Sequence, residues 1–225
     1  KYDEPVYTDP DQERIYKQQG RWTDARYGYV SAGLFTSQEE IDALDYTYKD
    51  LNGNSTLRPG DIKYLDINGD KVLDWKDQKE IGKGTLPTWT YGFDMNLKYR
   101  DFDLAALFQG AFGYTTYLDM TKAASTLKYD NRWTEKENNP NSLVARPGGA
   151  STNNLYSDFN NHNTAYLRLK SLSIGYEVPK VLLTKVGVQQ LRIYVAGTNL
   201  FTISSLHKYG VDPEAPEGSP AYYYP

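Results

Sequence analysis

The sequence predicts an all-β fold: antiparallel strands of a transmembrane β-barrel joined by long extracellular loops. Three observations predict this class. Two adjacent segments alternate apolar and polar residues over a bilayer-crossing length, short joins alternate with very long ones, and 21 of the 225 residues are tyrosine. Tyrosine favours strands and the aromatic girdles where a barrel meets the membrane surface. A soluble β-sandwich with large insertions is the alternative for the same pattern.

Composition narrows the function classes. The net charge of −4 provides no basic footprint for a nucleic acid. The absence of cysteine excludes disulfides and thiol chemistry. No apolar run approaches the roughly 20 residues of a spanning helix, so any membrane crossing would have to use strands.

The first predicted element is a hairpin within 88–114. Segment 88–99, TWTYGFDMNLKY, alternates strictly between apolar and polar residues, which indicates a strand. After Arg100 and Asp101, segment 102–114, FDLAALFQGAFGY, resumes the alternation. Each strand exceeds the typical five or six residues of a soluble sheet and slightly exceeds the roughly 9–11 residues that cross a bilayer at a tilt.

Two further strands are expected within 165–201, joined by a short periplasmic turn. The segment YLRLKSLSIGYEV (166–178) changes parity midway. Either a bulge intervenes near Lys170, or the first half rises above the membrane with Arg168 and Lys170 in water. The segment LRIYVAGTNLF (191–201) alternates regularly, and the join PKVLLTKVGVQQ has room for one or two helical turns.

Strand parity predicts the surroundings of each side chain. One face should meet lipid and the other the barrel lumen. The residues expected on the lipid face are Trp89, Phe93, Leu97, Leu104, Phe108, Leu172, Ile174, Ile193 and Val195, and those expected in the lumen are Asp94, Asn96, Asp103 and Gln109.

The connections indicate a topology. Transmembrane barrels have brief periplasmic turns and long extracellular loops, because bare backbone cannot be left in lipid. Residues 1–87 and 115–164 are then expected to be extracellular loops, and 202–225 the loop before a final strand that the sequence lacks.

An acidic stretch within 1–87 resembles a calcium loop. In DINGDKVLDWKD (66–77), oxygen-bearing side chains fall at the spacing by which a twelve-residue loop surrounds one cation. Lys71 occupies the position that prefers glycine, so a metal-free pair of acidic turns is the alternative. The candidate ligands are Asp66, Asn68, Asp70, Val72 through its carbonyl, Asp74 and Asp77.

Other chemistry is sparse. Trp133, Asn138, Asn139 and Asn141 are candidates for stacking on a sugar or hydrogen bonding to a peptide; a loop packed on itself is the alternative. His162 and His207 are expected at loop surfaces, and the carboxylates of Asp212 and Glu214 in turns. No nucleophile or acid–base pattern is found, so an enzyme is not expected.

Six stretches carry a resemblance to a known family. They are GLFTSQEEIDA (33–43), PGDIKYLDINGD (59–70), IGKGTLPTWTYGFDMNLKYRDFDLAALFQG (81–110), RWTEKENNPNS (132–142), AYLRLKSLSIGYEVPK (165–180) and LRIYVAGTNLFTIS (191–204). In this order they resemble the C-terminal part of SusC/RagA-type, TonB-linked outer-membrane transporters of Bacteroidetes.

The resemblance implies the C-terminal strands of a 22-stranded barrel in the outer membrane of a Gram-negative bacterium. It also implies import of oligosaccharides or peptides, with a SusD-like surface lipoprotein and with TonB acting through an N-terminal part absent here. The alternative function is a secreted or surface all-β module for calcium binding or adhesion. The resemblance does not establish a metal site, because Lys71 stands where relatives with a more acidic loop have glycine.

Overall fold

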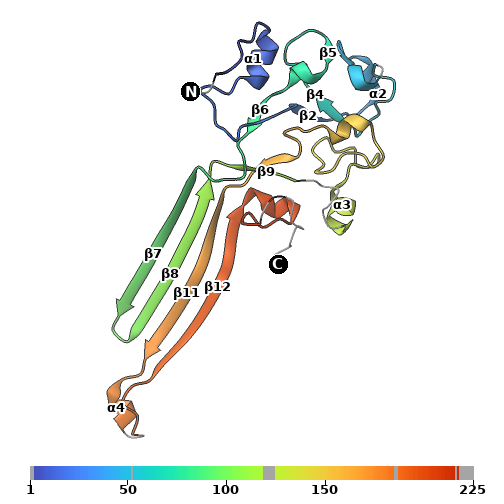
Figure 1. Cartoon of the computed structure of the whole chain (residues 1–225). Helices are drawn as coiled ribbons and strands as arrows, with labels where there is room; N and C mark the ends of the chain where they lie inside the picture. The colour runs from blue at the N-terminus through green and yellow to red at the C-terminus, as the bar shows by residue number, and fades with distance from the viewer. Residues whose placement is uncertain (1–2, 52, 119–124, 185–186, 216, 218–225) are drawn as a thin grey trace.

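The computed structural model describes residues 3–51, 53–118, 125–184, 187–215 and 217. It consists of a long four-stranded sheet with a lobe of short elements at one end (Figure 1). No helix within the described ranges is long and apolar enough to span a membrane. The sheet strands are β7 (Trp89–Tyr99), β8 (Phe102–Phe112), β11 (Tyr166–Glu177) and β12 (Arg192–Ser204).

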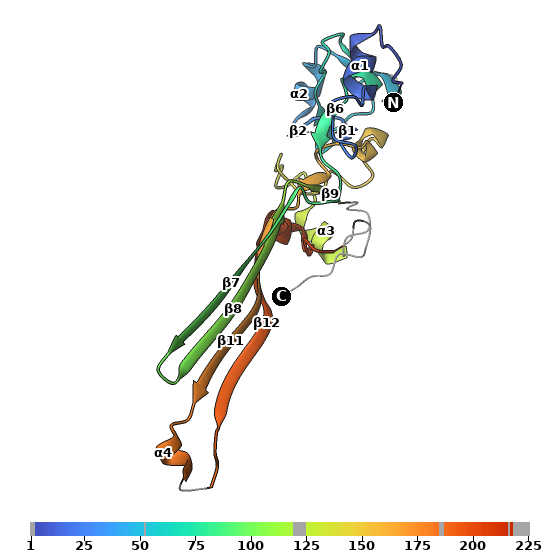
Figure 2. The ribbon, with the colours of Figure 1, turned by 60° about the vertical axis from the view of Figure 1, so that its left-hand side comes forward.

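The sheet is antiparallel throughout, with the strand order β12-β11-β8-β7. The four strands run side by side in every view (Figures 1 and 2). Strand β7 turns into β8 through Arg100 and Asp101, and Arg100 takes a left-handed φ of 53°. Such a φ is uncommon outside glycine, but a two-residue hairpin turn requires it.

One face of the sheet is apolar and open. Phe93 on β7 lies opposite Phe108 on β8, with ring centroids 6.3 Å apart, and Phe201 on β12 lies 6.4 Å from Phe108. Phe93 is 60% exposed and Val195 77% exposed. Nothing in the described chain covers this face, although burying large apolar side chains is the main favourable contribution to folding in water.

The other face is polar. Alternate residues place Asp94 and Asn96 of β7 and Asp103 and Gln109 of β8 away from the apolar row, in the registers Asp94↔Leu107 and Gly92↔Gln109. The predicted division of side chains between two faces is therefore confirmed for the hairpin, because the register keeps residues of equal parity together.

The predicted bulge near Lys170 is also confirmed. Leu169 and Ser171 of β11 pair with the consecutive residues Phe108 and Leu107 of β8, which leaves Lys170 as the extra residue. The bulge places Leu169 on the apolar face opposite Phe108. The parity change in the sequence is thus an inserted residue rather than the end of the strand.

The lobe consists of short elements that pair in twos, β1 with β6, β2 with β4, β3 with β5, and β9 with β10. Its elements are α1 (Pro10–Tyr16), β1 (Arg26–Gly28), β2 (Ser31–Leu34), α2 (Gln38–Asp42), β3 (Thr47–Tyr48), η1 (Lys49–Leu51), β4 (Ile62–Tyr64), β5 (Val72–Leu73), η2 (Trp75–Asp77), β6 (Lys79–Gly82), β9 (Thr115–Tyr117), α3 (Ser125–Asn131), η3 (Ser151–Asn154) and β10 (Asn161–Asn163). Two elements lie outside it in sequence, α4 (Lys180–Leu183) between β11 and β12, and η5 (Ser205–Tyr209) after β12.

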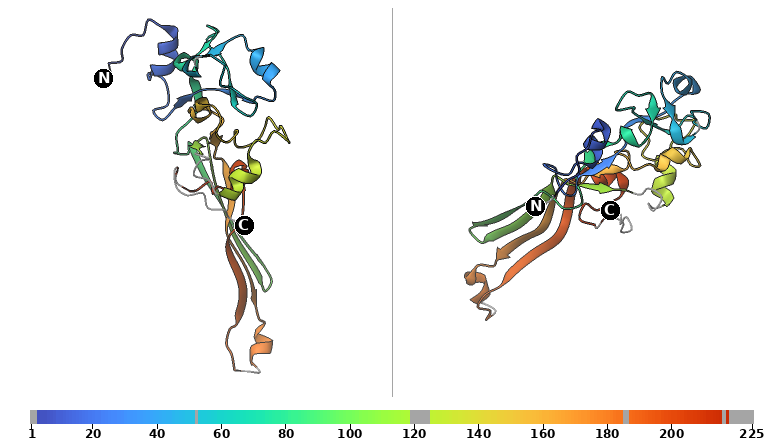
Figure 3. Two further views of the ribbon diagram at one scale, coloured as in Figure 1. Left: turned by 90° about the vertical axis from the view of Figure 1, so that its right-hand side faces the viewer. Right: turned by 45° about the horizontal axis from the view of Figure 1, so that its top comes forward.

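The lobe has a hydrophobic core of its own. Phe35, Tyr48 and Tyr64 are at most 1% exposed, and Trp133 and Ala150 from the second long connection pack into the same cluster. Residues expected to form two long loops therefore fold into one packed unit at the end of the sheet (Figure 3). Aromatic burial and short strand pairs hold this unit together without long secondary structure.

Candidate functional site

The acidic loop 66–77 is closed by its own backbone amides. Asp66 accepts hydrogen bonds from the amides of Gly69 at 2.8 Å and Lys71 at 2.9 Å. Asp70 accepts one from the amide of Val72 at 2.9 Å. Lys71 has a φ of 66°, so the chain takes the left-handed turn that glycine favours and does so with lysine.

Asp77 anchors the end of this loop. It is fully buried, and its two oxygens accept hydrogen bonds from the amides of Ile67 and Asp74, each at 2.8 Å. Burial raises the pKa of Asp77, and these amide donors counteract that rise. Asp74 in turn accepts from the amide of Lys76 and pairs with Lys49 at 3.3 Å. The carboxylates thus have backbone or lysine partners.

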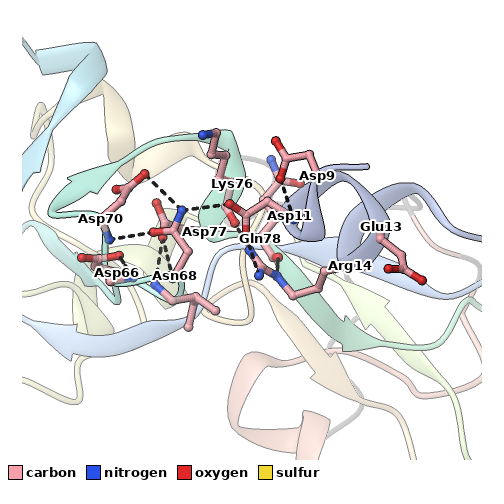
Figure 4. A network of polar contacts seen from close by, with 12 residues as sticks. Asp9, Asp11, Glu13, Arg14, Asp66, Asn68, Asp70, Lys76, Asp77 and Gln78 are labelled. Carbon is pink, nitrogen blue, oxygen red and sulfur yellow. Dashed lines mark hydrogen bonds and ion pairs between the residues drawn. The ribbon is translucent and has the colours of Figure 1, made fainter. Parts of the chain in front are cut away.

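The loop also connects helix α1 to strand β6 (Figure 4). The Asn68 amide donates to Asp11 at 3.2 Å, and this bond, together with Arg14, lowers the pKa of Asp11. Arg14 pairs with Asp11 at 2.7 Å and donates to the Gln78 carbonyl at 3.3 Å. The side chains predicted as metal ligands therefore form a structural joint between separate parts of the lobe.

The donor chemistry of this loop suits calcium, but its oxygens do not converge. Within the described residues, no group of three or more histidine, cysteine, aspartate or glutamate side chains is arranged to hold a metal ion. Val72 lies in β5 and pairs with Thr47, so its placement is explained by strand pairing. Calcium binding at Asp66, Asn68, Asp70, Val72, Asp74 and Asp77 stays a prediction.

The predicted substrate contacts lie at the edge of the lobe core. Trp133 is 6% exposed and donates to Asn138 at 3.3 Å, while Asn138 donates to the Thr36 carbonyl at 2.9 Å. Asn139 accepts from the amide of Asn141 at 2.9 Å. Trp133 offers no free ring face to a ligand, so its packing matches the alternative of a loop folded on itself.

The surface expectation is wrong for one histidine. His162 on β10 is half-buried, stacks on Tyr209 of η5 with centroids 4.2 Å apart, and contacts the Tyr209 hydroxyl through Nδ1 at 3.3 Å. Burial lowers the pKa of His162 to about 4, with a smaller contribution from Lys208. No local sequence pattern indicates this contact, because Tyr209 lies 47 residues away from His162. His207 is exposed, as expected.

An ion-pair cluster lies on the polar face where the sheet meets the lobe. Arg168 of β11 is buried and pairs with Asp212 at 2.6 Å and with Glu214, and Lys170 pairs with Glu214 at 2.8 Å. Tyr114 donates to the Pro213 carbonyl at 3.1 Å. Asp212 and Glu214, expected as simple turn formers, fasten the segment after η5 onto the sheet. Burial of Arg168 excludes the placement of this residue in water.

Two cavities flank this junction. One of about 630 Å³ lies on the polar face beneath residues 213–215 and is lined by Thr90, Gln109, Tyr114 and Tyr166 among others. Another of about 790 Å³ lies in the lobe between Arg132, Arg146 and Phe159. Among the described residues that line them, neither cavity has a nucleophile paired with a base.

The structure combines a long antiparallel sheet, which has one open apolar face and one polar face, with short turns at one end and a folded lobe at the other. This combination is typical of a segment of an outer-membrane-type β-barrel protein.

Comparison with protein-family models gives no match. The chain is 34% identical to the TonB-dependent receptor P3 of Formosa agariphila over 195 residues, which is 84% of this chain and 18% of that receptor. It is 31% identical to the TonB-dependent receptor P26 of the same organism over 83% of this chain and 19% of that receptor.

The TonB-dependent receptor SusC of Bacteroides thetaiotaomicron is 26% identical over 89% of this chain and 19% of its own length. The solved structure of the RagAB peptide importer in the 'open-open' state has a TM-score of 0.58 and 21% identity, covering 88% of this chain and 21% of that chain. The RagAB peptide transporter gives a TM-score of 0.57 at 19% identity over 88% of this chain and 21% of that chain.

The chain belongs to the SusC-type TonB-dependent receptors, which are outer-membrane proteins of Gram-negative bacteria. This confirms the family resemblance in the sequence. It also agrees with the prediction that the chain is not an enzyme, since the curated relatives are receptors. The chain spans less than a fifth of the length of the first curated relatives, 18% and 19%.

Proposed function

We propose that the chain forms the C-terminal wall of a 22-stranded, TonB-dependent barrel that imports oligosaccharides or peptides across the outer membrane. The division of the sheet into an open apolar face and a polar face is the observation that carries the proposal. Lipid contact accounts for the exposure of Phe93 and Val195, which would destabilise a protein in water.

Strand length supports a membrane-spanning wall. Strands β7 and β8 have 11 residues each. At about 3.4 Å per residue, such a strand is about 37 Å long. A tilt of about 40° from the barrel axis reduces its height to about 28 Å, close to the roughly 30 Å of a bilayer's hydrocarbon core.

The sheet edges support barrel closure by further strands. Strands β7 and β12 each have a neighbour on only one side in the described chain. Unpaired amides and carbonyls cannot be left in lipid, because no water is there to bond them. The proposal therefore assigns these two edges to neighbouring strands of the same barrel, with the polar face lining the lumen and the Arg168 cluster at its extracellular mouth.

The partners follow from the family. Names of similar proteins include SusC and the RagAB peptide importer. We propose a SusD-like lipoprotein as the extracellular partner, with the lobe contributing to the rim that it contacts, and TonB as the partner of a part of the receptor outside this chain. The exposed aromatics Trp22 and Tyr16 on the lobe, the latter stacked on the half-buried Trp75, are suitable contact residues.

The experiment uses the full-length receptor in its native membranes. Purification through a tag on the receptor should recover a surface lipoprotein in a fixed ratio, and deletion of the receptor gene should abolish growth on one class of oligosaccharide or peptide. A receptor that never copurifies with a lipoprotein, and whose deletion affects the uptake of neither class, would contradict the proposal.

A further inference from the structure

The short connection between β11 and β12 has an unexpected surface. Residues 178–184 and 187–191 lie at the end of the sheet opposite the lobe, near the β7–β8 turn, and contain the single-turn helix α4 (Figures 1 and 2). A minimal turn would need only two residues, as between β7 and β8. The additional residues form a folded projection beyond the strands.

The aliphatic side chains of this projection point outward. Leu183 is 5% exposed, and its carbonyl accepts a hydrogen bond from the amide of Val188 at 3.2 Å, which closes the turn. Val181 is 76% exposed and Leu182 58% exposed, although both belong to the same helical turn. Val188 and Leu191 are also exposed. Among the described residues 180–184 and 187–191, the fold thus buries one aliphatic side chain and leaves four at the surface.

This aliphatic surface continues the apolar face of the sheet. Leu191 has the same parity as Ile193 and Val195, and its carbonyl accepts from the amide of Val178, directly beyond Tyr176. Phe102 and Tyr176 form an aromatic pair at this end, with centroids 4.7 Å apart. Aromatic residues at the end of a lipid-facing band mark the level of the lipid headgroups.

The projection itself carries lysine and no acidic residue, and the adjacent Glu177 pairs with Lys98 at 3.6 Å. Segment 178–191 contains Lys180 and Lys185 and neither aspartate nor glutamate. Lys180 is exposed, and Arg100 on the neighbouring turn lies over the Tyr99 ring at 5.3 Å. Aliphatic side chains flanked by exposed cations match a phospholipid surface, in which acyl chains lie beneath anionic phosphates.

We infer that α4, together with the exposed Val188 and Leu191, forms a membrane-surface anchor in the periplasmic leaflet of the outer membrane. Val181 and Leu182 enter the boundary between headgroups and acyl chains, and Lys180 pairs with phosphate. This rests on the proposed barrel, because the barrel brings this end of the sheet to the periplasmic side. The anchor fixes the depth and tilt of two adjacent strands.

The test places a fluorophore at the projection in the full-length, cysteine-free receptor in phospholipid nanodiscs. An environment-sensitive nitrobenzoxadiazole label is attached at Leu182→Cys, and at Phe93→Cys and Glu135→Cys as references for lipid and water. Quenching by a phospholipid carrying a spin label high on its acyl chain is compared with quenching by aqueous iodide. Because Leu182 is exposed, the substitution removes no core contact.

Several-fold stronger quenching at Leu182→Cys by the lipid than by iodide is expected, approaching the value at Phe93→Cys. Quenching by iodide as strong as at Glu135→Cys would place the projection in water and overturn the inference. Protection from both quenchers would assign it to contact with another part of the receptor and would overturn it equally. Failure of the lipid to quench the label at Phe93→Cys would contradict the barrel itself, so the two failures are distinguishable.

The charge contribution has its own measurement. Lys180→Glu should lower lipid quenching at Leu182→Cys at least twofold in nanodiscs with phosphatidylglycerol. In nanodiscs of phosphatidylcholine alone, Lys180→Glu should change the lipid quenching at Leu182→Cys little. Thr184→Glu, on the same turn, introduces a charge without removing a cation and is the matched control. An equal effect of Lys180→Glu in both lipids would contradict the pairing of Lys180 with anionic lipid phosphate.

Discussion

Asp103 on β8 and Arg192 on β12 form a two-point ion pair across the intervening strand β11, with Asp103 Oδ1 and Arg192 Nε 2.9 Å apart. They meet over Gly175, where an added Cβ would lie 2.5 Å from both the Asp103 carboxylate and the Arg192 guanidinium. The absence of a side chain at Gly175 is therefore what lets strands two positions apart bond directly. Such a bridge fixes the spacing of three strands on the polar face.

Substitution of Gly175 tests this bridge. Gly175→Ala should separate the ion pair and lower the melting temperature of the full-length receptor slightly, since solvent and salt weaken an exposed ion pair. Gly92→Ala is the matched control, because its Cβ would meet only the Phe108 carbonyl at 3.7 Å. Thermal unfolding is measured for both glycine variants, each in the native background and in the Asp103→Asn background, in which the ion pair is already absent. Equal losses with and without Asp103→Asn would show that the bridge is not the cause.

A second glycine tests the lobe core. Gly60 has a φ of 90°, and a Cβ there would lie 2.4 Å from the Trp133 ring. Gly60→Ala should destabilise the lobe by about 3 kcal/mol, from backbone strain of roughly 1–2 kcal/mol and overpacking of roughly 1–3 kcal/mol. Gly53→Ala shares the positive φ but meets no atom within 4 Å, so it isolates the backbone contribution. Hydrogen exchange of strand β4 measures both, and equal protection in the two variants would contradict close packing of Trp133 on Gly60.

His162 predicts a pH dependence. Its pKa of about 4 lies below the ordinary value of 6.5, so the folded state favours the neutral ring. The resulting stability is fully present above pH 6.5 and is lost as the pH falls through about 4, with a limit of about 3 kcal/mol. Hydrogen exchange in η5 should therefore accelerate between pH 6.5 and pH 4.

The controls for this dependence are two single variants of the full-length receptor. His162→Phe keeps the stacking on Tyr209 and should remove the acceleration of exchange at low pH. His207→Gln, at an exposed position in η5, should retain this acceleration. Persistence of the full pH effect in His162→Phe would assign it to other groups.

Two substitutions in the acidic loop distinguish a structural carboxylate from one predicted to bind calcium. Asp77→Asn should cost about 1–3 kcal/mol, because its amide nitrogen would face a buried backbone donor. Asp70→Ala leaves that buried network intact and should cost less than about 1 kcal/mol. Thermal unfolding with calcium or with a chelator measures both variants. A calcium-induced rise in Tm that Asp70→Ala abolishes would establish the metal site. A response to calcium that Asp70→Ala leaves unchanged would exclude calcium binding at this loop.

Local patterns in the sequence were sufficient for the strands and insufficient for the lobe. Period-two alternation and the parity change near Lys170 depend on consecutive residues, so the sheet, its faces and the bulge were predictable. Burial of Trp133 against Gly60 and of Arg168 against Asp212 depends on contacts between residues 73 and 44 positions apart. No short-range signal marks such pairs, which is why the sequence leaves Trp133 open between substrate contact and a loop packed on itself and predicts only a simple turn for Asp212.

Adjacent residues on β7 and β8 provide the most direct measurement of the lipid-facing wall. Single cysteines at Phe93, Asp94, Phe108 and Gln109 of the full-length receptor in native membranes would be labelled with a water-soluble maleimide. The proposed barrel predicts labelling at 94 and 109 through the lumen and protection at 93 and 108 by lipid, with the pattern alternating along each strand. Labelling at 93 and 108 with protection at 94 and 109 would contradict it.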